Sequence, residues 1–293
     1  MPKMSKVSFT GDWKLLFKPE KYAGYINDHT IYKDITGKWK LLGTSSKGEY
    51  KFNKERQFIL GETASLNKEM VEVGNFFTNE PHKGIKIAPN VYFDVKTKTY
   101  HLFFAPMFIY HYISTDGNSW QRVDDAVRSF WPALRDPFVL KVDGCYFMYL
   151  TDYGNRISVY KSNDLFKWKK LKRSALILDS EIPRSFNSSC ESPCVFKKGK
   201  NFFLTTTITP SPQGRRFNYC HTPVFISEDP ENFGVYSTNP KKCLNRIGDL
   251  ETHAPEFVED DNKMYLTSCG WKNFPKPIGV DGEGVYIREI EII

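Results

Sequence analysis

The sequence predicts an all-β protein that folds as one five-bladed β-propeller over residues 1–293. Two short motifs that recur along the chain, together with weak helical periodicity, support this prediction. Strands of about six residues separated by Gly, Asn, Asp and Lys turns are typical of all-β folds. Five units of about 45 to 65 residues fit propeller blades, in which the first strand of each blade lines the central axis.

The first motif is a residue followed by Pro and then by an apolar strand. His29 takes the place of the Pro in one of its copies, which are Asp28-His29, Ala88-Pro89, Asp136-Pro137, Ser192-Pro193 and Ala254-Pro255. An aromatic residue opens the next strand nine to eleven residues after each Pro or His. We therefore expect blades to begin near residues 26, 87, 134, 190 and 252, after an N-terminal lead-in over residues 1–24. The five residues before the Pro or His should then converge on one axis.

The second motif reads Ser-x-Asp-x-x-x-aromatic and begins at Ser114, Ser162 and Ser227. The separation from Pro89 to Ser114 and from Pro137 to Ser162 is 25 residues in both cases. Its Ser and Asp can bond the local backbone and shape a turn, so that the aromatic ring folds back over the blade. We assign this motif a structural purpose. Residues 62–73 are the one candidate for a short helix.

Composition limits the classes of function. Aromatic residues make up 15% of the chain, and they either fill half-buried strands or line a sugar-binding mouth. The net charge of +7 arises from 41 basic and 34 acidic residues. The basic residues stand in short groups at expected turns, whereas nucleic-acid-binding proteins concentrate them on one face or arm. We therefore expect no nucleic-acid partner.

Cysteine usage and the absence of targeting segments predict a cytoplasmic protein. The spacing of the six cysteines fits neither a small disulfide framework nor paired zinc half-sites, so free thiols in a reducing compartment are expected. The first residues lack the apolar segment of a secretory signal. No run of 18 apolar residues is present, so no membrane span is expected.

Three acids fall where the inner strands begin: Asp28, Asp136 and Glu191. Most acids of a chain are solvated or form turns, but these three adjoin apolar strands. Crowding of like charges raises the pKa of at least one carboxyl group while another stays ionised. Glycoside cleavage needs such a pair of carboxyl groups, one protonated and one ionised. The sequence therefore predicts a catalytic carboxyl cluster on the axis.

The ordered motifs resemble the five-bladed propeller glycosidases, namely glycoside hydrolase family 43 and its relatives in families 32, 62 and 68. The segments that carry this resemblance are Ile26-Asn27-Asp28, Leu134-Arg135-Asp136-Pro137, Cys190-Glu191-Ser192-Pro193 and His253-Ala254-Pro255. The resemblance extends from about residue 25 to 290. It implies that Asp28 is the general base or nucleophile and that Glu191 is the general acid. Asp136 would orient the acid, tune its pKa and hold sugar hydroxyls.

The resemblance also implies residues that contact the substrate. Arg135 looks like the hydroxyl clamp of the fructoside-active relatives, although an Asp-paired structural arginine is an equal alternative. His253 takes the position of a channel histidine that some members place beside water or an ion; a hydrogen-bonded core histidine is the alternative. Asn27, Asn90 and Trp131 complete the expected set. No cofactor and no protein metal site are expected.

Two departures from the family patterns leave the substrate open. The family 32 pattern continues after Asn-Asp with Pro-Asn-Gly, whereas His29-Thr30-Ile31 follow Asp28 here, and Arg before the second Asp is less common in family 43. We expect a hydrolase of a small arabinoside, xyloside or fructoside that works with inversion. A sugar-binding propeller without turnover and a transferase or cyclase that reuses the acids are the alternatives.

Overall fold

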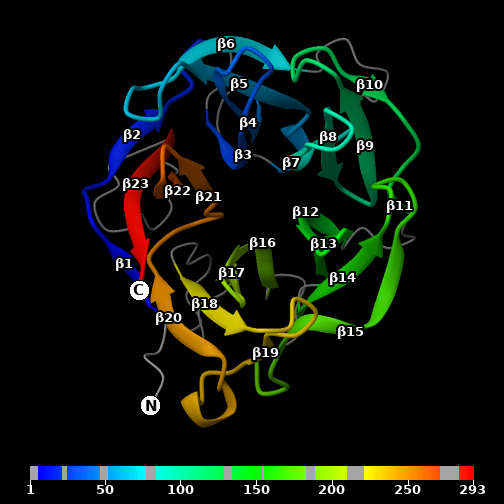
Figure 1. Ribbon diagram of the computed structural model, residues 1–293, viewed down its shortest axis with the longest axis vertical. Helices are drawn as coiled ribbons and strands as arrows, with labels where there is room; N and C mark the ends of the chain where they lie inside the picture. Colours follow the sequence, from blue (N-terminus) through cyan, green and yellow to red (C-terminus); the bar gives the residue numbers. More distant parts are fainter. Residues whose placement is uncertain are drawn as a thin grey trace.

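The computed structural model describes residues 6–21, 25–46, 52–76, 84–128, 134–153, 155–182, 189–209, 221–270 and 284–293. The strands form five sheets around a central axis, which confirms the predicted five-bladed β-propeller (Figure 1). The helical segments within these ranges are two short 3₁₀ turns, η1 (Phe52–Lys54) and η2 (Pro240–Lys242). None of the helices in the described ranges has the length and hydropathy needed to cross a membrane.

Each blade is an antiparallel sheet whose first strand lies nearest the axis. Blade 1 contains β3 (Asn27–Lys33), β4 (Trp39–Ser45), β5 (Gln57–Thr63) and β6 (Val71–Phe76). Blade 2 contains β7 (Ile87–Asp94), β8 (Thr99–Ala105), β9 (Phe108–Ser114), β10 (Gln121–Arg122) and β11 (Val127–Arg128). Blade 3 contains β12 (Arg135–Val142), β13 (Cys145–Asp152), β14 (Arg156–Ser162) and β15 (Lys169–Leu178). Blade 4 contains β16 (Ser189–Lys198), β17 (Asn201–Thr209), β18 (Thr222–Ser227) and β20 (Arg246–Leu250).

The last sheet joins the two ends of the chain. Blade 5 contains β21 (Phe257–Asp260), β22 (Lys263–Gly270), β23 (Gly284–Ile292), β1 (Val7–Phe9) and β2 (Lys14–Phe17). Strands β1 and β2 both pair with β23, and Val7 lies opposite Ile292. The expected lead-in over residues 1–24 therefore contains two strands that close the ring. A further strand, β19 (Gly234–Tyr236), pairs in parallel with β15 and so joins the segment between β18 and β20 to blade 3.

The prediction of a short helix over residues 62–73 is wrong. This segment contains the end of β5 and the start of β6, and Glu62 lies opposite Val71 in the hairpin. Local helix propensity favoured a helix, but it amounts to less than 1 kcal/mol per residue. Pairing of β5 with both β4 and β6 outweighs this preference.

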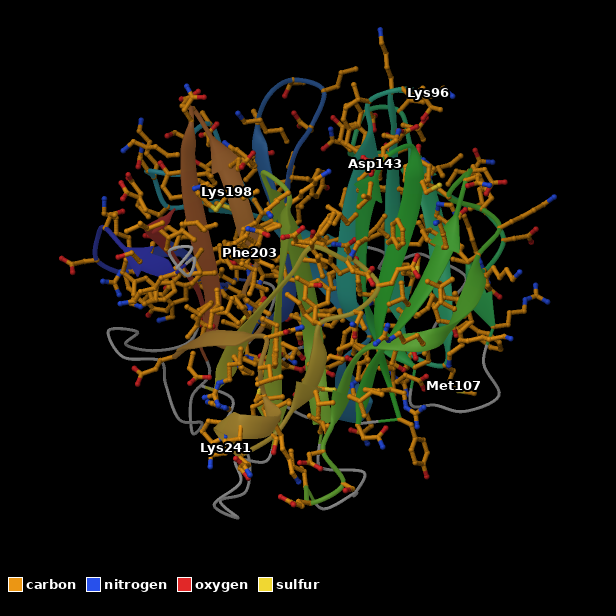
Figure 2. The ribbon with its side chains drawn as sticks, turned by 60° about the horizontal axis from the view of Figure 1, so that its bottom comes forward. Lys96, Met107, Asp143, Lys198, Phe203 and Lys241 are labelled. Carbon is orange, nitrogen blue, oxygen red and sulfur yellow. The ribbon has the colours of Figure 1, made fainter. Side chains whose placement is uncertain are left out.

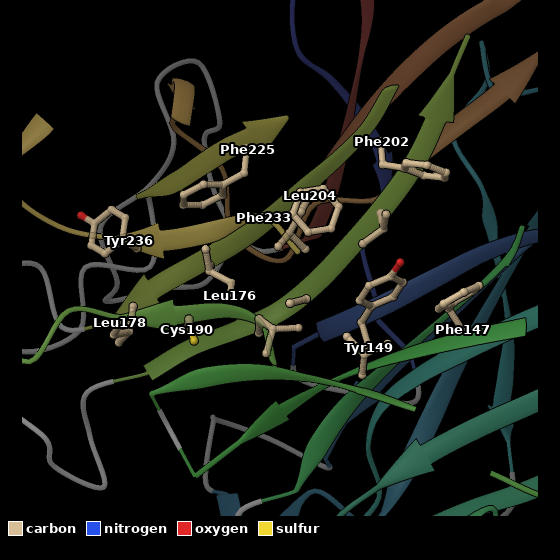
Figure 3. Packing of buried hydrophobic residues seen from close by; sticks show 14 of the residues in the cluster. Phe147, Tyr149, Leu176, Leu178, Cys190, Phe202, Leu204, Phe225, Phe233 and Tyr236 are labelled. Atoms are coloured by element: carbon tan, nitrogen blue, oxygen red, sulfur yellow. The ribbon is translucent and has the colours of Figure 1, made fainter. Parts of the chain in front are cut away.

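Hydrophobic cores lie between neighbouring blades. Figure 3 shows one of them, where Tyr149 and Leu176 of blade 3 pack against Leu204 and Phe225 of blade 4. All four side chains are fully buried. Every residue of β4 is buried because blades cover both faces of this strand. The rings in these cores account for much of the aromatic content.

The Ser-x-Asp motif forms the expected turns. The Ser114 hydroxyl oxygen accepts a hydrogen bond from the backbone N–H three residues later (2.9 Å), and the Asp116 carboxylate accepts one from the N–H three residues after it (2.7 Å). The copy at 162–168 repeats both bonds. The Trp120 ring that ends the first copy meets Tyr32 of the preceding blade edge-on, at 6.3 Å between centroids. The motif thus attaches one blade to the blade before it.

A ring of hydrogen bonds joins the inner strands around the axis. Four of its members share one geometry, in which a side chain near the start of one inner strand accepts a bond from a backbone N–H of the next. These pairs are Ile31 with Glu256 (3.0 Å), Val91 with Thr30 (3.2 Å), Val139 with Asn90 (3.1 Å) and Phe257 with Cys194. The corresponding residue of blade 3 is Phe138, which has no polar side-chain atom. The first residues of the inner strands are therefore fixed across blades as well as within them.

Glu256 is the member of this ring that carries a carboxyl group. Burial raises the pKa of Glu256 to about 8, and hydrogen bonds from Ile31, Thr30 and Asn90 oppose this shift. Its carboxyl group is therefore protonated in the folded state at neutral pH. The unfolded chain, with an ordinary pKa of 4.5, releases that proton. Folding stability contributed by this group is present at low pH and is lost as the pH rises toward 8.

Replacement of Glu256 by Gln should remove this pH dependence. The amide keeps an acceptor for Ile31 and gains donors for Thr30 or Asn90, but it cannot ionise. Between pH 5 and pH 8, the wild type should lose about 1 kcal/mol or more of unfolding free energy relative to Glu256→Gln. Chemical denaturation at both pH values measures this difference. Glu259→Gln, an exposed change on β21, which begins directly after Glu256, should follow the wild type. The same change of unfolding free energy with pH in all three proteins would contradict a raised pKa for Glu256.

Candidate active site

The five inner strands begin around one pocket. Its lining includes the five residues that precede Pro or His in the first motif: Asp28, Ala88, Asp136, Ser192 and Ala254. The predicted convergence of these positions is therefore confirmed. Figure 2 shows Lys96, Asp143 and Lys198, which lie where inner strands end, on the side of the molecule opposite Met107. Because Met107 lies in the turn between β8 and β9, and Ile87 at the start of β7 pairs with Ala105 at the end of β8, the inner strands begin on the Met107 side.

All five of these residues have positive φ, between 33° for Asp28 and 55° for Asp136. A left-handed backbone in a residue other than glycine costs about 1–3 kcal/mol and persists only where its surroundings hold it. The pairing register shifts immediately afterwards in β3, β7, β12 and β16. A bulge of this kind bends the strand and changes where its side chains point. Consecutive residues such as Arg135 and Asp136 can therefore both reach one cluster.

Ser192 connects two of the predicted acids. Its hydroxyl group donates to Asp28 Oδ1 (2.8 Å), and its backbone N–H donates to Asp136 Oδ2 (3.1 Å). The Thr151 hydroxyl also donates to Asp136 Oδ2 (2.7 Å), and Asp136 is 5% exposed. Asp136 is thus held by blades 3 and 4 together. Sequence reasoning missed Ser192 and Thr151, although Ser192 occupied a motif position.

Arg135 connects the other pair of acids. Its Nη2 lies 2.8 Å from Glu191 Oε2, and its Nε lies 3.4 Å from Asp136 Oδ2. The guanidinium group is therefore in the cluster, where it neutralises part of the negative charge. Cys190, the preceding neighbour of Glu191, is fully buried in the core between blades 3 and 4. The structure brings all three predicted catalytic acids and Arg135 together.

Asp28 has the most strongly perturbed charge of the cluster. Burial raises the pKa of Asp28 well above its ordinary value, and the charges of Asp136 and Glu191 raise it further. The hydrogen bond from Ser192 acts in the opposite direction because it favours the ionised form. The cluster thus contains a carboxyl group whose pKa is raised and another that is paired with Arg135.

A fourth carboxyl group, that of Glu55, adjoins the cluster. It is 1% exposed, and its Oε1 accepts a hydrogen bond from the Tyr25 hydroxyl (2.8 Å). Burial raises the pKa of Glu55 to about 7, and the Asp136 charge adds to this shift. Glu55 precedes β5 and belongs to neither repeated motif. Its place near the axis follows from the packing of blade 1 against blade 2.

The two histidines near the axis are neutral. Burial lowers the pKa of His253 and of His29 to about 3. The ring nitrogens of His29 lie 3.0 Å from Cys269 Sγ and 2.7 Å from Thr267 Oγ1. His253 is 4% exposed, and its backbone N–H donates to the Ser268 hydroxyl. Among the residues that the structure describes, no three His, Cys, Asp or Glu side chains are arranged to hold a metal ion.

The remaining predicted contacts lie in different surroundings. Asn27 is 8% exposed and hydrogen bonds to Glu55, and its buried side-chain oxygen has no partner within the described part of the chain. Asn90 belongs to the inter-blade ring, where it accepts from Val139 and bonds Glu256. Its substrate contact stays a prediction, since its side chain is already engaged between blades. Trp131 lies outside the described residues.

A propeller whose axis carries these three acids and an arginine has the carboxyl groups that glycoside cleavage requires. Comparison with known families supports this class, because the model described as Glycosyl hydrolases family 43 matches residues 132–289. The match covers more than half of the sequence. The chain belongs to glycosyl hydrolase family 43 and is a glycoside hydrolase.

Solved structures with the same fold extend over almost the whole chain. The catalytic domain of a family 62 α-L-arabinofuranosidase from Coprinopsis cinerea has a TM-score of 0.70 at 12% identity and covers 97% of both chains. A Bacillus subtilis arabinanase has a TM-score of 0.66 at 14% identity, covering 92% of this chain and 95% of its own. A family 32 β-fructofuranosidase from Bombyx mori has a TM-score of 0.61 at 16% identity, covering 97% of this chain and 62% of its own. No curated protein matches the sequence significantly.

Replacement of Arg135 tests its place in the cluster. Arg135→Ala removes charge-assisted hydrogen bonds, so kcat/KM for glycoside hydrolysis should fall by about 10- to 100-fold while the circular dichroism spectrum stays unchanged. Arg135→Lys should recover only part of the loss, because an ammonium group cannot bridge two carboxylates as a planar fork. Arg122→Ala, in a surface pair with Asp125, serves as the control. Unchanged kcat/KM in Arg135→Ala would assign Arg135 a purely structural role.

Proposed function

We propose that this glycoside hydrolase cleaves a small furanoside, with α-L-arabinofuranosides as the first class to test, and that it does so with inversion. The observation that carries the proposal is the carboxyl cluster, in which Ser192 bonds both Asp28 and Asp136 while Glu191 is paired with Arg135. Two of the similar structures bear the names arabinofuranosidase and fructofuranosidase, so furanoside cleavage is the activity they share.

In this proposal Asp28 is the general base and Glu191 is the general acid. Asp28 takes a proton from a water molecule as the oxygen of that water attacks the anomeric carbon. Glu191 gives a proton to the leaving oxygen as the glycosidic bond breaks. Asp28 then holds a proton and Glu191 is ionised. Before another turnover, a proton must leave Asp28 and another must reach Glu191.

Arg135 links substrate binding to this proton transfer. In the free protein its guanidinium group favours the ionised form of Glu191, because an opposite charge at 2.8 Å stabilises a carboxylate. A sugar hydroxyl that accepts a hydrogen bond from Arg135 competes with Glu191 for the guanidinium group. Substrate binding would then favour the protonated form of Glu191 that a general acid requires. Asp136, fixed by Ser192 and Thr151, would keep Arg135 in place.

We also propose a reducing, cytoplasmic location for the enzyme. The support is the state of the cysteines, since Cys145, Cys190, Cys194, Cys243 and Cys269 are free thiols in the structure. Fusion of the full-length protein to a fluorescent reporter would test this location.

Aryl α-L-arabinofuranosides with leaving groups of different pKa test the assignment of roles. Glu191→Gln should lower kcat by about 10²- to 10⁴-fold with a poor leaving group, and by much less with an activated one that needs little protonation. Asp28→Asn should lower kcat severely with both, because activation of water does not depend on the leaving group. Proton NMR of the first-formed product would show an inverted anomeric configuration.

Asp143→Asn provides the matched control, since Asp143 lies in an exposed turn on the far side of the molecule. An equal dependence of Glu191→Gln and Asp28→Asn on leaving-group pKa would contradict the roles. Parallel assays with aryl xylosides and fructosides decide the sugar. Sugar binding without hydrolysis of any glycoside would favour the binding-protein alternative.

A further inference from the structure

Glu55 is a buried carboxyl group whose two hydrogen-bonding partners both lie in the segment that leads into Asp28. The Tyr25 hydroxyl donates to its Oε1 at 2.8 Å, and the Asn27 side chain bonds it as well. The backbone oxygen of Glu55 accepts from the N–H of Lys86, which immediately precedes β7. Glu55 is therefore fixed between the inner strands of blades 1 and 2. A buried acid in such a place lowers stability unless it is well paired.

The hydrogen bond to Glu55 leaves one end of the Asn27 side chain without a partner among the described residues. A side-chain amide has an oxygen acceptor and a nitrogen donor, and the bond to the Glu55 carboxylate uses the donor. The Asn27 oxygen is buried and has no partner among the described residues. Glu55 thus sets which end of the amide is available beside Asp28. An unpaired buried acceptor lowers stability, and a hydrogen bond from a substrate hydroxyl would offset that cost.

We propose that Glu55 is a positioning residue of the active site, which orients the Asn27 amide and adds a negative charge to the field around Asp28. This inference rests on the proposed function, in which Asp28 is the base. It names a fourth carboxyl group beyond the three acids of the cluster. The charge of Glu55 is one of the causes that raise the pKa of Asp28. With its own pKa raised to about 7, Glu55 gains or loses this charge near neutral pH.

Other groups around the pair do not give the same effect. The charged or titratable neighbours are Arg135, Asp136, Glu191, His29, Cys269 and Lys86. Burial keeps His29 and Cys269 neutral near pH 7, since it lowers the pKa of the histidine and raises that of the thiol. The remaining four are present in both wild type and a Glu55 variant. A difference between those two proteins therefore reports on Glu55.

The pH profile of kcat/KM tests the inference. Its acid limb reports the ionisation of Asp28 in the free enzyme. Glu55→Gln keeps an acceptor for Tyr25 and removes the charge, so the pKa of Asp28 falls and the acid limb moves to lower pH by about half a unit or more. Ser192→Ala removes a hydrogen bond to ionised Asp28 and should move the limb to higher pH. Glu62→Gln, on β5 where Glu62 pairs with Lys38 and Lys40, should leave the limb in place.

Stability measurements separate this inference from the proposed function. The folded state keeps the Glu55 proton up to about pH 7, whereas the unfolded chain releases it near 4.5, so Glu55 destabilises the fold as the pH rises through this window. Glu55→Gln should therefore gain stability over the wild type between pH 5 and pH 8. The gain should be smaller in an Asp28→Asn background, because the repulsion between the two charges is already absent.

The outcomes are distinct. An active enzyme whose acid limb is the same in Glu55→Gln and Glu62→Gln would overturn the inference. If the wild type hydrolyses no glycoside, the proposed function fails, and the unfolding free energies of the single and double variants of Glu55 and Asp28 decide the inference. Coupling between the two substitutions supports the inference. Strict additivity of their effects overturns it. Tyr25→Phe gives a second test should Glu55→Gln fold poorly. Loss of the Tyr25 bond raises the pKa of Glu55, so the limb should move the same way by a smaller amount.

Discussion

Five residues with left-handed backbone, one at the start of each inner strand, fix the centre of this molecule. The left-handed conformation of each residue costs free energy that must be offset. Hydrogen bonds that these residues donate to other strands provide part of the offset. The N–H of Ala88 donates to Thr44 Oγ1 (2.9 Å), and that of Ala254 donates to Thr207 Oγ1 (3.1 Å). Both acceptors belong to the preceding blade. The blades are therefore held together where the pocket begins.

Between blades 3 and 4, the corresponding hydrogen bond involves an acid of the carboxyl cluster. The N–H of Ser192 donates to Asp136, so the acceptor here is a carboxyl group, whereas a threonine hydroxyl is the acceptor in two other blades. An acid that is part of the frame cannot rotate away from the cluster, and Thr151 restrains it further. Groups held in this way stabilise developing charge without reorganisation during the reaction. Fold and chemistry depend on one contact here.

Charge crowding near the axis gives the acids different properties although they are close together. Burial and the neighbouring carboxylates raise the pKa of Asp28, whereas Glu191 has the Arg135 guanidinium group at 2.8 Å. Glu256 remains protonated because of its burial alone, and it supports the inter-blade ring. The local environment, more than the residue type, therefore sets what each acid contributes.

The sequence by itself determined the positions of the inner strands, because the motif at Asp28, Ala88, Asp136, Ser192 and Ala254 acts through local backbone geometry. It likewise determined the Ser-x-Asp turns, whose hydrogen bonds span three residues. It did not determine the strands in residues 7–17 or the hairpin in place of a helix at 62–73, since pairing with distant strands decided both. Only the tertiary structure brought Glu55 to the cluster and placed Arg135 between two acids. The Arg135–Glu191 pair joins blades 3 and 4, and Glu55 lies 30 residues from Tyr25, so no local spacing encodes these contacts.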